Sequence, residues 1–141
     1  MKNLHMALLG GIIALASCAT VEKTMTLNDI EGEWNIVEAG GETLDTSKSE
    51  TKPFIGFDLK QGRVYGSSGC NSIMNTIDKN AKAGTIDLQH MASTMMACPD
   101  METERKVLDA LTKAKSYRKA GKNKVALCDA AGKQVVLLVR K

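Results

Sequence analysis

Apolar and polar residues alternate along much of the chain, and this alternation is typical of β-strands that bury one face. In residues 33–39 (EWNIVEA) the apolar positions are Trp34, Ile36 and Val37, which predicts a first strand with its tryptophan pointing inward. A Gly-Gly turn then leads to residues 42–44, the short returning arm of a hairpin.

The same pattern predicts a second hairpin in the middle of the chain. In residues 54–59 (FIGFDL) one side of the strand is apolar and the other is nearly polar. A turn at Lys60-Gln61-Gly62 leads to residues 63–67 (RVYGS) as the partner strand. Further extended segments are expected at 85–88, 91–96, 116–119, 125–128 and 134–139.

One helix interrupts the strands. It is expected to begin near Cys98-Pro99-Asp100, because proline is favoured at the first helical position and acidic residues in the first turn. Apolar residues then recur at helical spacing, at Val107, Leu108, Leu111 and Ala114, with Met101 and Glu104 on or beside this stripe. A single stripe predicts one face packed on a sheet. The fold class is therefore α+β, mostly β, with a curled antiparallel sheet or open barrel packed around one α-helix.

The chain opens with a lysine and an apolar run from Met6 to Ala16, which is too short to span a bilayer as a mature helix. This pattern predicts a signal peptide over residues 1–17. The run ends in Leu15-Ala16-Ser17-Cys18, which resembles the bacterial lipobox, so Cys18 is expected to become the lipidated first residue. The alternative is an ordinary signal peptide to which Cys18 is incidental.

Lipidation would anchor everything that follows to a membrane. Residues 18–26 then form the lipidated cysteine and a polar tether, and residues 27–141 form one domain without internal repeats. The expected location is the bacterial cell envelope. The outer membrane facing the periplasm is favoured, because no aspartate retention signal follows Cys18.

Charge and motifs exclude several classes of function. The formal net charge of +3 is small for 141 residues and gives no argument for nucleic-acid binding. The sequence contains no nucleophile elbow, phosphate loop or zinc-ligand spacing. The carboxylates Asp58, Glu102 and Glu104 are assigned to an exposed strand face and to the start of the helix. We therefore expect no enzyme activity and no cofactor.

Several separate motifs resemble one protein family. The first strand follows the pattern L-x-x-I-x-G-x-W, which ends at Trp34, and Gly69-Cys70-Asn71 follows the second hairpin. Residues 92–99 read A-S-T-M-M-A-C-P, with Thr94 and Met95 near the centre. With the helix that follows and a closing L-C-D-x-x-G hairpin, these motifs resemble the META domain family, which includes the bacterial heat-shock protein HslJ.

The resemblance covers residues 27–141 and implies a compact, mostly β domain with a helix laid against it. Such domains occur in bacterial envelope lipoproteins and are linked in some members to heat-shock or antibiotic tolerance, and the family brings no catalytic mechanism. Members commonly continue the Cys-Asn motif with an aromatic residue and a glycine. Here Ile73 replaces the aromatic contact, and Asn75 is expected to adopt the left-handed backbone that favours glycine.

The resemblance also bears on the three cysteines of the mature domain, Cys70, Cys98 and Cys128. A disulfide between Cys70 and Cys98 is favoured because both lie in family motifs and the compartment is oxidising. The competing pair is Cys98 with Cys128. A thiol-redox protein that uses Cys98 is an alternative function, since a helix N-terminus favours the thiolate.

A second alternative is a Cu(I)-binding module, because thioether and thiol sulfurs suit that ion. Its candidate ligands are His90, Met91, Met95, Met96, Cys98 and Met101, with Cys70 and Met74 as further neighbours. We prefer the interpretation that methionine fills irregular gaps in a core poor in aromatic residues.

The leading expectation is a non-catalytic binding module that serves envelope maintenance or stress tolerance. Its partner would be an envelope protein or a small apolar ligand in the mouth of the curled sheet. The membrane is reached through Cys18.

Overall fold

The computed structural model describes residues 22–141, so the predicted signal peptide and Cys18 lie outside the described residues. The strands are β1 (Gly32–Ala39), β2 (Glu42–Thr43), β3 (Phe54–Asp58), β4 (Arg63–Ser67), β5 (Ser72–Thr76), β6 (Ala92–Ser93), β7 (Ser116–Gly121), β8 (Lys124–Cys128) and β9 (Gln134–Arg140). The helices are α1 (Leu27–Ile30) and α2 (Met101–Lys113).

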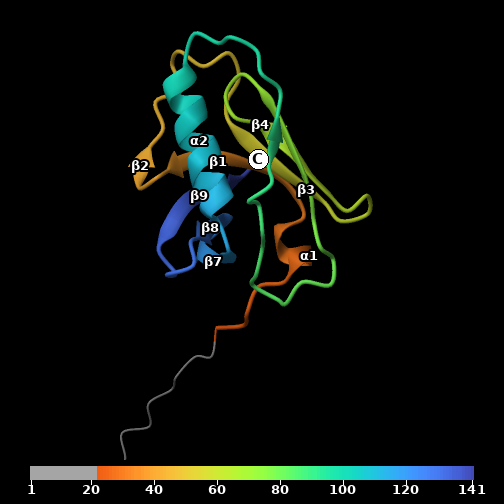
Figure 1. Ribbon diagram of the computed structural model, residues 1–141. Helices are drawn as coiled ribbons and strands as arrows, with labels where there is room; N and C mark the ends of the chain where they lie inside the picture. The colour runs from red at the N-terminus through yellow and green to blue at the C-terminus, as the bar shows by residue number, and fades with distance from the viewer. Residues whose placement is uncertain (1–21) are drawn as a thin grey trace, which may run out of the picture.

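The strands form one antiparallel sheet that curls around α2 (Figure 1). Its order is β6-β5-β4-β3-β1-β9-β8-β7, with β2 paired to β1 at the side. An isolated bridge joins Thr85, in the loop between β5 and β6, to Ser116 at the start of β7, and the sheet does not close into a barrel. The predicted fold class is confirmed.

Two predicted extended segments differ from the structure. Residues 85–88 contribute only the bridge at Thr85, and of residues 91–96 only β6 forms a strand. Conversely, β5 was not expected as a strand. It pairs with β4 along its whole length, which places Asn75 in regular strand pairing rather than in a left-handed turn, so that expectation was wrong.

β1 carries the inward-facing tryptophan as predicted, since Trp34 and Ile36 are both buried. The register against β9 shifts between Ile36 and Glu38, which marks a β-bulge at Val37. The bulge moves the inward phase by one residue, so Ala39 is buried and Val37 is only half-buried. Alternation alone could not show this shift.

α2 begins later than the proline rule predicts. Asp100 is the N-cap residue, and its side chain accepts a hydrogen bond of 3.1 Å from the backbone N–H of Thr103. Pro99 therefore lies before the cap rather than at the first helical position. The helix packs against β1 and β9 and buries Val107 and Leu111 completely, as the apolar stripe predicts.

Candidate functional site

The turn between β4 and β5, residues 67–72, is called the corner here. Gly69 has φ +123°, a value that favours glycine. The backbone N–H of Ser68 donates to the carbonyl of Asn71 at 3.0 Å, and the N–H of Gly69 donates to Ser67 Oγ at 3.1 Å. These local hydrogen bonds fix the backbone of the turn and so the directions in which the Cys70 and Asn71 side chains point.

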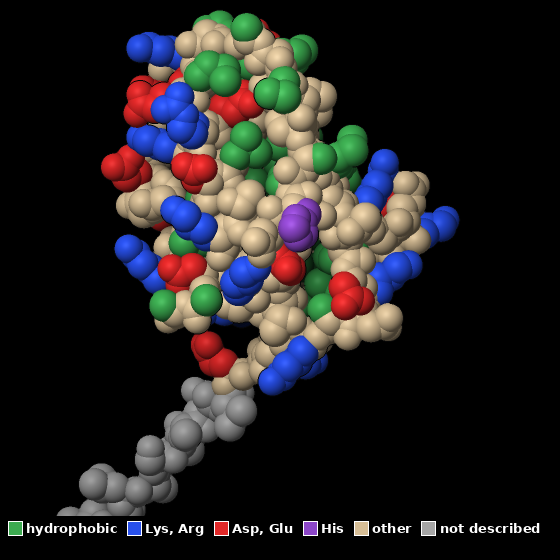
Figure 2. Space-filling model, in the orientation of Figure 1, with side chains coloured by type: hydrophobic (Ala, Val, Ile, Leu, Met, Phe, Trp, Pro, Cys, Tyr) green, Lys and Arg blue, Asp and Glu red, His purple; other side chains and the backbone are tan. Residues whose placement is uncertain are grey.

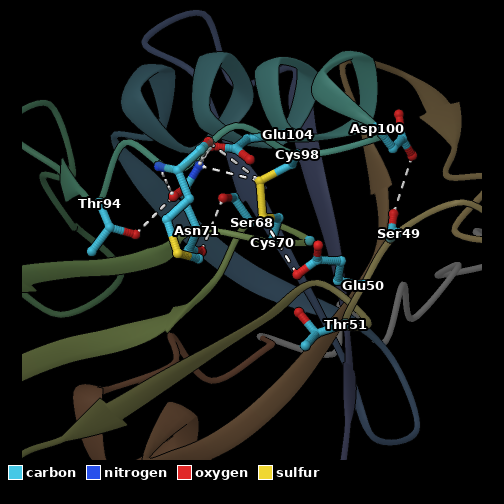
Figure 3. The surroundings of a disulfide bond; sticks show 12 residues. Ser49, Glu50, Thr51, Ser68, Cys70, Asn71, Thr94, Cys98, Asp100 and Glu104 are labelled. Atoms are coloured by element: carbon cyan, nitrogen blue, oxygen red, sulfur yellow. Dashed lines mark hydrogen bonds between the residues drawn. A yellow bond between two sulfur atoms is a disulfide. The ribbon is translucent and has the colours of Figure 1, made fainter.

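The corner is covalently joined to the segment that precedes α2. Cys70 and Cys98 form a disulfide with a Cα–Cα distance of 6.1 Å, which is the pair favoured from the motifs (Figure 3). Cys128 is a buried free thiol. The disulfide therefore ties residues 94–100, called the strap, to the sheet just before the helix begins.

Asn71 is the hydrogen-bonding centre of the corner and is almost completely buried, with 1% of the residue exposed. Its Oδ1 accepts from the backbone N–H of Met96 at 2.7 Å and from Thr94 Oγ1 at 2.8 Å. Its Nδ2 donates to Glu104 Oε1 at 2.6 Å and to the carbonyl of Met96 at 3.2 Å. The Asn71 side chain thus bonds to the strap and to the helix rather than to its own turn.

Glu104 lies inside the protein on the first turn of α2, with only 4% of the residue exposed. Its Oε1 is bonded to Asn71, whereas its Oε2 is buried and has no hydrogen-bond partner among the described residues. Figure 3 shows the carboxyl group between Asn71 and the disulfide. Glu104 therefore lies at the start of the helix, as expected, but its carboxyl group is buried.

A sequence signal for this burial does exist. Glu104 precedes Val107 by three residues and Leu111 by seven, so it falls on the apolar stripe itself. A carboxylate on such a stripe indicates a buried polar partner. Nothing in the sequence identifies that partner as Asn71, which is 33 residues away.

A second set of polar contacts holds the segment before β3 against the corner and the helix start. Ser49 Oγ donates to Asp100 Oδ2 at 3.1 Å, and the hydroxyls of Thr51 and Ser67 lie 2.7 Å apart. Hydrogen bonding to Thr103, with a smaller contribution from Ser49, lowers the pKa of Asp100 below its ordinary value. The N-cap carboxylate is thus stabilised in its charged form.

The other motif residues have separate roles. Trp34 Nε1 donates to the carbonyl of Ile30 at 2.7 Å, and the Arg140 guanidinium lies 3.9 Å from the centre of the tryptophan ring. Trp34 therefore holds α1 against β1. It takes no part in the corner. Met95, in contrast, is 96% exposed and packs in no core.

The proposed Cu(I) ligands are not gathered into one buried cluster. Cys98 is bonded to Cys70, His90, Met95 and Met96 are exposed, and Met91 is partly buried against the core. Among the described residues, the group of acidic, histidine and cysteine side chains with metal-site spacing is Cys70, Cys98 and Glu104. The interpretation of methionine as core filler fails for the exposed methionines.

A surface hollow of about 400 Å³ lies between α1 and the loop that follows β5. Apolar atoms from Leu27, Ile77 and Ile86 line it together with Asp78 and His90. It is half-open to solvent and mixed in character, unlike the enclosed apolar mouth expected for a small apolar ligand. Within residues 22–141, no helix has the length and apolar character needed to cross a bilayer.

Comparison with known proteins identifies the family and the fold. The family model described as META domain matches residues 23–141. A protein from Burkholderia xenovorans solved by NMR is 20% identical, with a TM-score of 0.60 over 82% of this chain and 86% of that one. A DUF4847 family protein from Bacteroides vulgatus, solved by crystallography, is 18% identical, with a TM-score of 0.54 over 79% and 94%. Comparison with the curated proteins gives no match.

Proposed function

The chain belongs to the META domain family, and on this premise we propose that it is a lipid-anchored envelope protein that acts by binding a protein partner and not by catalysis. The partner would serve envelope maintenance or stress tolerance, including tolerance of heat or antibiotics. The observation that carries the proposal is an exposed apolar surface.

All large hydrophobic side chains that are exposed among the described residues are methionines. They are Met74, Met95, Met96 and Met101, and together they are called the methionine surface. Met74 lies on β5, whose neighbour β6 leads directly into the strap that carries Met95 and Met96. Figure 2 shows several separate hydrophobic side chains on the upper part of the face in view.

Exposed apolar groups of this kind favour binding to a protein. Methionine is flexible and polarisable, and it is used at surfaces that adapt to partners. Met95 and Met96 are adjacent in the strap, and exposed apolar side chains that cluster on a surface commonly mark an interaction site. The surface hollow beside α1 opens to solvent and has polar as well as apolar walls, so it gives less support to a small apolar ligand.

The orientation of the domain supports a partner that is away from the membrane. Figure 1 shows the described chain entering at one end of the molecule, while the strap lies at the opposite end. Anchoring at Cys18 would therefore present the methionine surface to the periplasm.

The proposal is tested by photo-crosslinking in intact cells with Cys18 present. A photoreactive amino acid at position 95 should give a defined adduct, and the same probe in place of Lys119 on β7 is the matched control. Met74→Ser with Met96→Ser should remove the adduct while the melting temperature stays unchanged. Equal crosslinking at positions 95 and 119 would contradict a dedicated surface.

Lipidation is tested separately. Growth with an alkyne-labelled palmitate analogue should label the wild-type chain and leave Cys18→Ser unlabelled. Labelling of Cys18→Ser, or no labelling of the wild type, would remove the anchor from the proposal.

A further inference from the structure

Three side chains of types that commonly bind metals converge where the strap, the corner and the first turn of α2 meet. One ligand atom from each of Cys70, Cys98 and Glu104 lies within 4.8 Å of the others. We propose that, when the disulfide is reduced, these three side chains bind a thiophilic divalent cation such as Zn²⁺ or Cd²⁺. This site goes beyond the proposed partner binding and uses none of the methionine surface.

The backbone already holds the two cysteines at a spacing that suits a shared metal ion. The Cα atoms of Cys70 and Cys98 are 6.1 Å apart. Two thiolates on a tetrahedral Zn²⁺ at about 2.3 Å lie roughly 3.8 Å from each other. The sulfurs therefore need to separate by about 2 Å from their bonded distance, which side-chain rotation can supply without moving the backbone.

Glu104 offers a ligand atom that has no other task. Its Oε2 is buried and unpartnered, although buried polar atoms in folded proteins are almost always hydrogen-bonded. A bound cation would give this oxygen its missing partner. Figure 3 shows the carboxyl group beside Cys98, on the side of the disulfide that faces α2.

Asn71 fixes which carboxylate oxygen is free. Because its Oδ1 accepts the backbone N–H of Met96, its Nδ2 must face Glu104, where it donates to Oε1. The backbone N–H of Met96 thus determines which end of the Asn71 side-chain amide is oxygen and which is nitrogen. Such a partner behind a metal-binding carboxylate is the usual second layer of a metal site.

A fourth ligand is available on the surface side. Glu50 Oε2 lies 3.7 Å from Cys70 Sγ, and Glu50 is exposed. Either this carboxylate or a water molecule can complete four-fold coordination. Two thiolates exclude Mg²⁺ and Ca²⁺, which prefer oxygen, and favour Zn²⁺ and Cd²⁺.

The redox chemistry balances with a phosphine as reductant. The phosphorus donates two electrons to the S–S bond, water supplies one proton to each sulfur, and the water oxygen ends on the phosphine oxide. Binding of one cation then releases the two thiol protons. Oxidation by dioxygen, which takes two electrons from the thiolates and two protons from water and becomes hydrogen peroxide, restores the disulfide and expels the cation. Disulfide formation and metal binding therefore exclude each other.

The test uses the full chain in detergent, reduced with the phosphine and titrated with Cd²⁺. We expect one Cd²⁺ per chain, detected by thiolate-to-cadmium charge-transfer absorption, and no such absorption from the oxidised chain. Glu104→Gln should weaken binding at least tenfold. Glu102→Gln, on the exposed face of the same helix turn, should bind as the wild type does.

Two further measurements keep the result interpretable. Cys128→Ala removes the remaining thiol of the described domain and should leave binding unchanged. Cd²⁺ should also raise the melting temperature of the reduced wild type, and raise it less in Glu104→Gln. Equal affinity in the wild type and Glu104→Gln overturns the proposal, as does a reduced chain that unfolds and is not restored by the cation.

Discussion

α2 is held to the sheet in two different ways along its length. Its middle turns bury Val107 and Leu111 against β1 and β9, where contacts are apolar. Its first turn meets the corner through Glu104, which is bonded to Asn71 and lies next to the disulfide. The apolar region depends on the shape and area of many side chains, whereas the corner depends on a few specific partners.

The difference predicts different responses to substitution. Apolar packing is non-directional, so a conservative change in volume is tolerated and loss of volume is costly. In the corner, each polar group relies on a named partner, and removal of one partner leaves the other buried without a bond. Mutations can therefore distinguish the two regions by their chemistry as well as by their size.

The largest effect is expected in the apolar region. Leu111→Ala should lower the free energy of unfolding by about 4 kcal/mol, because Leu111 is completely buried and the cavity collapses only partly. Urea denaturation measures this loss. Leu108→Ala, at a half-buried position on the same helix, is the control and should cost less than half as much.

Removal of the disulfide should cost slightly less. The bond closes a loop with a sequence separation of 28, and the chain-entropy relation gives about 3 to 4 kcal/mol for Cys70→Ser with Cys98→Ser. Chemical reduction of the wild type should give the same loss in metal-free buffer. Cys70→Ser alone should add one reactive thiol at Cys98, and the idea of a fastened corner fails if neither the thiol nor the loss is found.

Asn71→Asp should destabilise the corner through charge, because the new side chain has almost the same size as asparagine. Two carboxyl groups would then face each other where Nδ2 and Oε1 are 2.6 Å apart, and they cannot both ionise at low cost. The shared pKa of the new pair is raised, so the penalty is present at neutral pH and is relieved as the pH falls through that raised value. We expect a loss of about 2 kcal/mol at pH 7 that shrinks as the pH is lowered. A loss independent of pH would indicate a purely steric effect.

The smallest effect concerns the helix cap. Hydrogen bonding to Thr103 lowers the pKa of Asp100, so its stabilising contribution is present above the unfolded value near 3.9 and is lost as the pH falls through the lower folded value. Asp100→Asn should therefore lower the melting temperature at pH 7 by a few degrees at most. The difference from the wild type should vanish in strong acid, and Asp109→Asn in the middle of α2 should show no such trend.

The two regions also differ in how far the sequence predicts them. The apolar stripe of α2 and the alternation in β1 and β3 indicate their elements because burial there follows a repeating pattern. The family motifs add the disulfide pair. The bulge in β1 breaks the pattern by one residue, and alternation cannot locate such a break.

The corner could not be predicted in the same way. The residue type does not tell whether a glutamate is buried or exposed, and only the position of Glu104 on the apolar stripe suggests burial. Its partner Asn71 belongs to another element, and the strap between them is irregular. Pairing of polar groups that are far apart in the sequence depends on the assembled fold, and it produces no periodic pattern in the local sequence.

The central claim is that Asn71 and Glu104 act as a coupled pair that fastens the first turn of α2 to the corner. A double-mutant cycle with Asn71→Ala, Glu104→Ala and the double variant, followed by urea denaturation, measures that coupling directly. The account predicts a coupling energy of about 1 to 3 kcal/mol, because each single variant leaves the other group buried without its partner. Additive losses, with a coupling below about 0.3 kcal/mol, would contradict it.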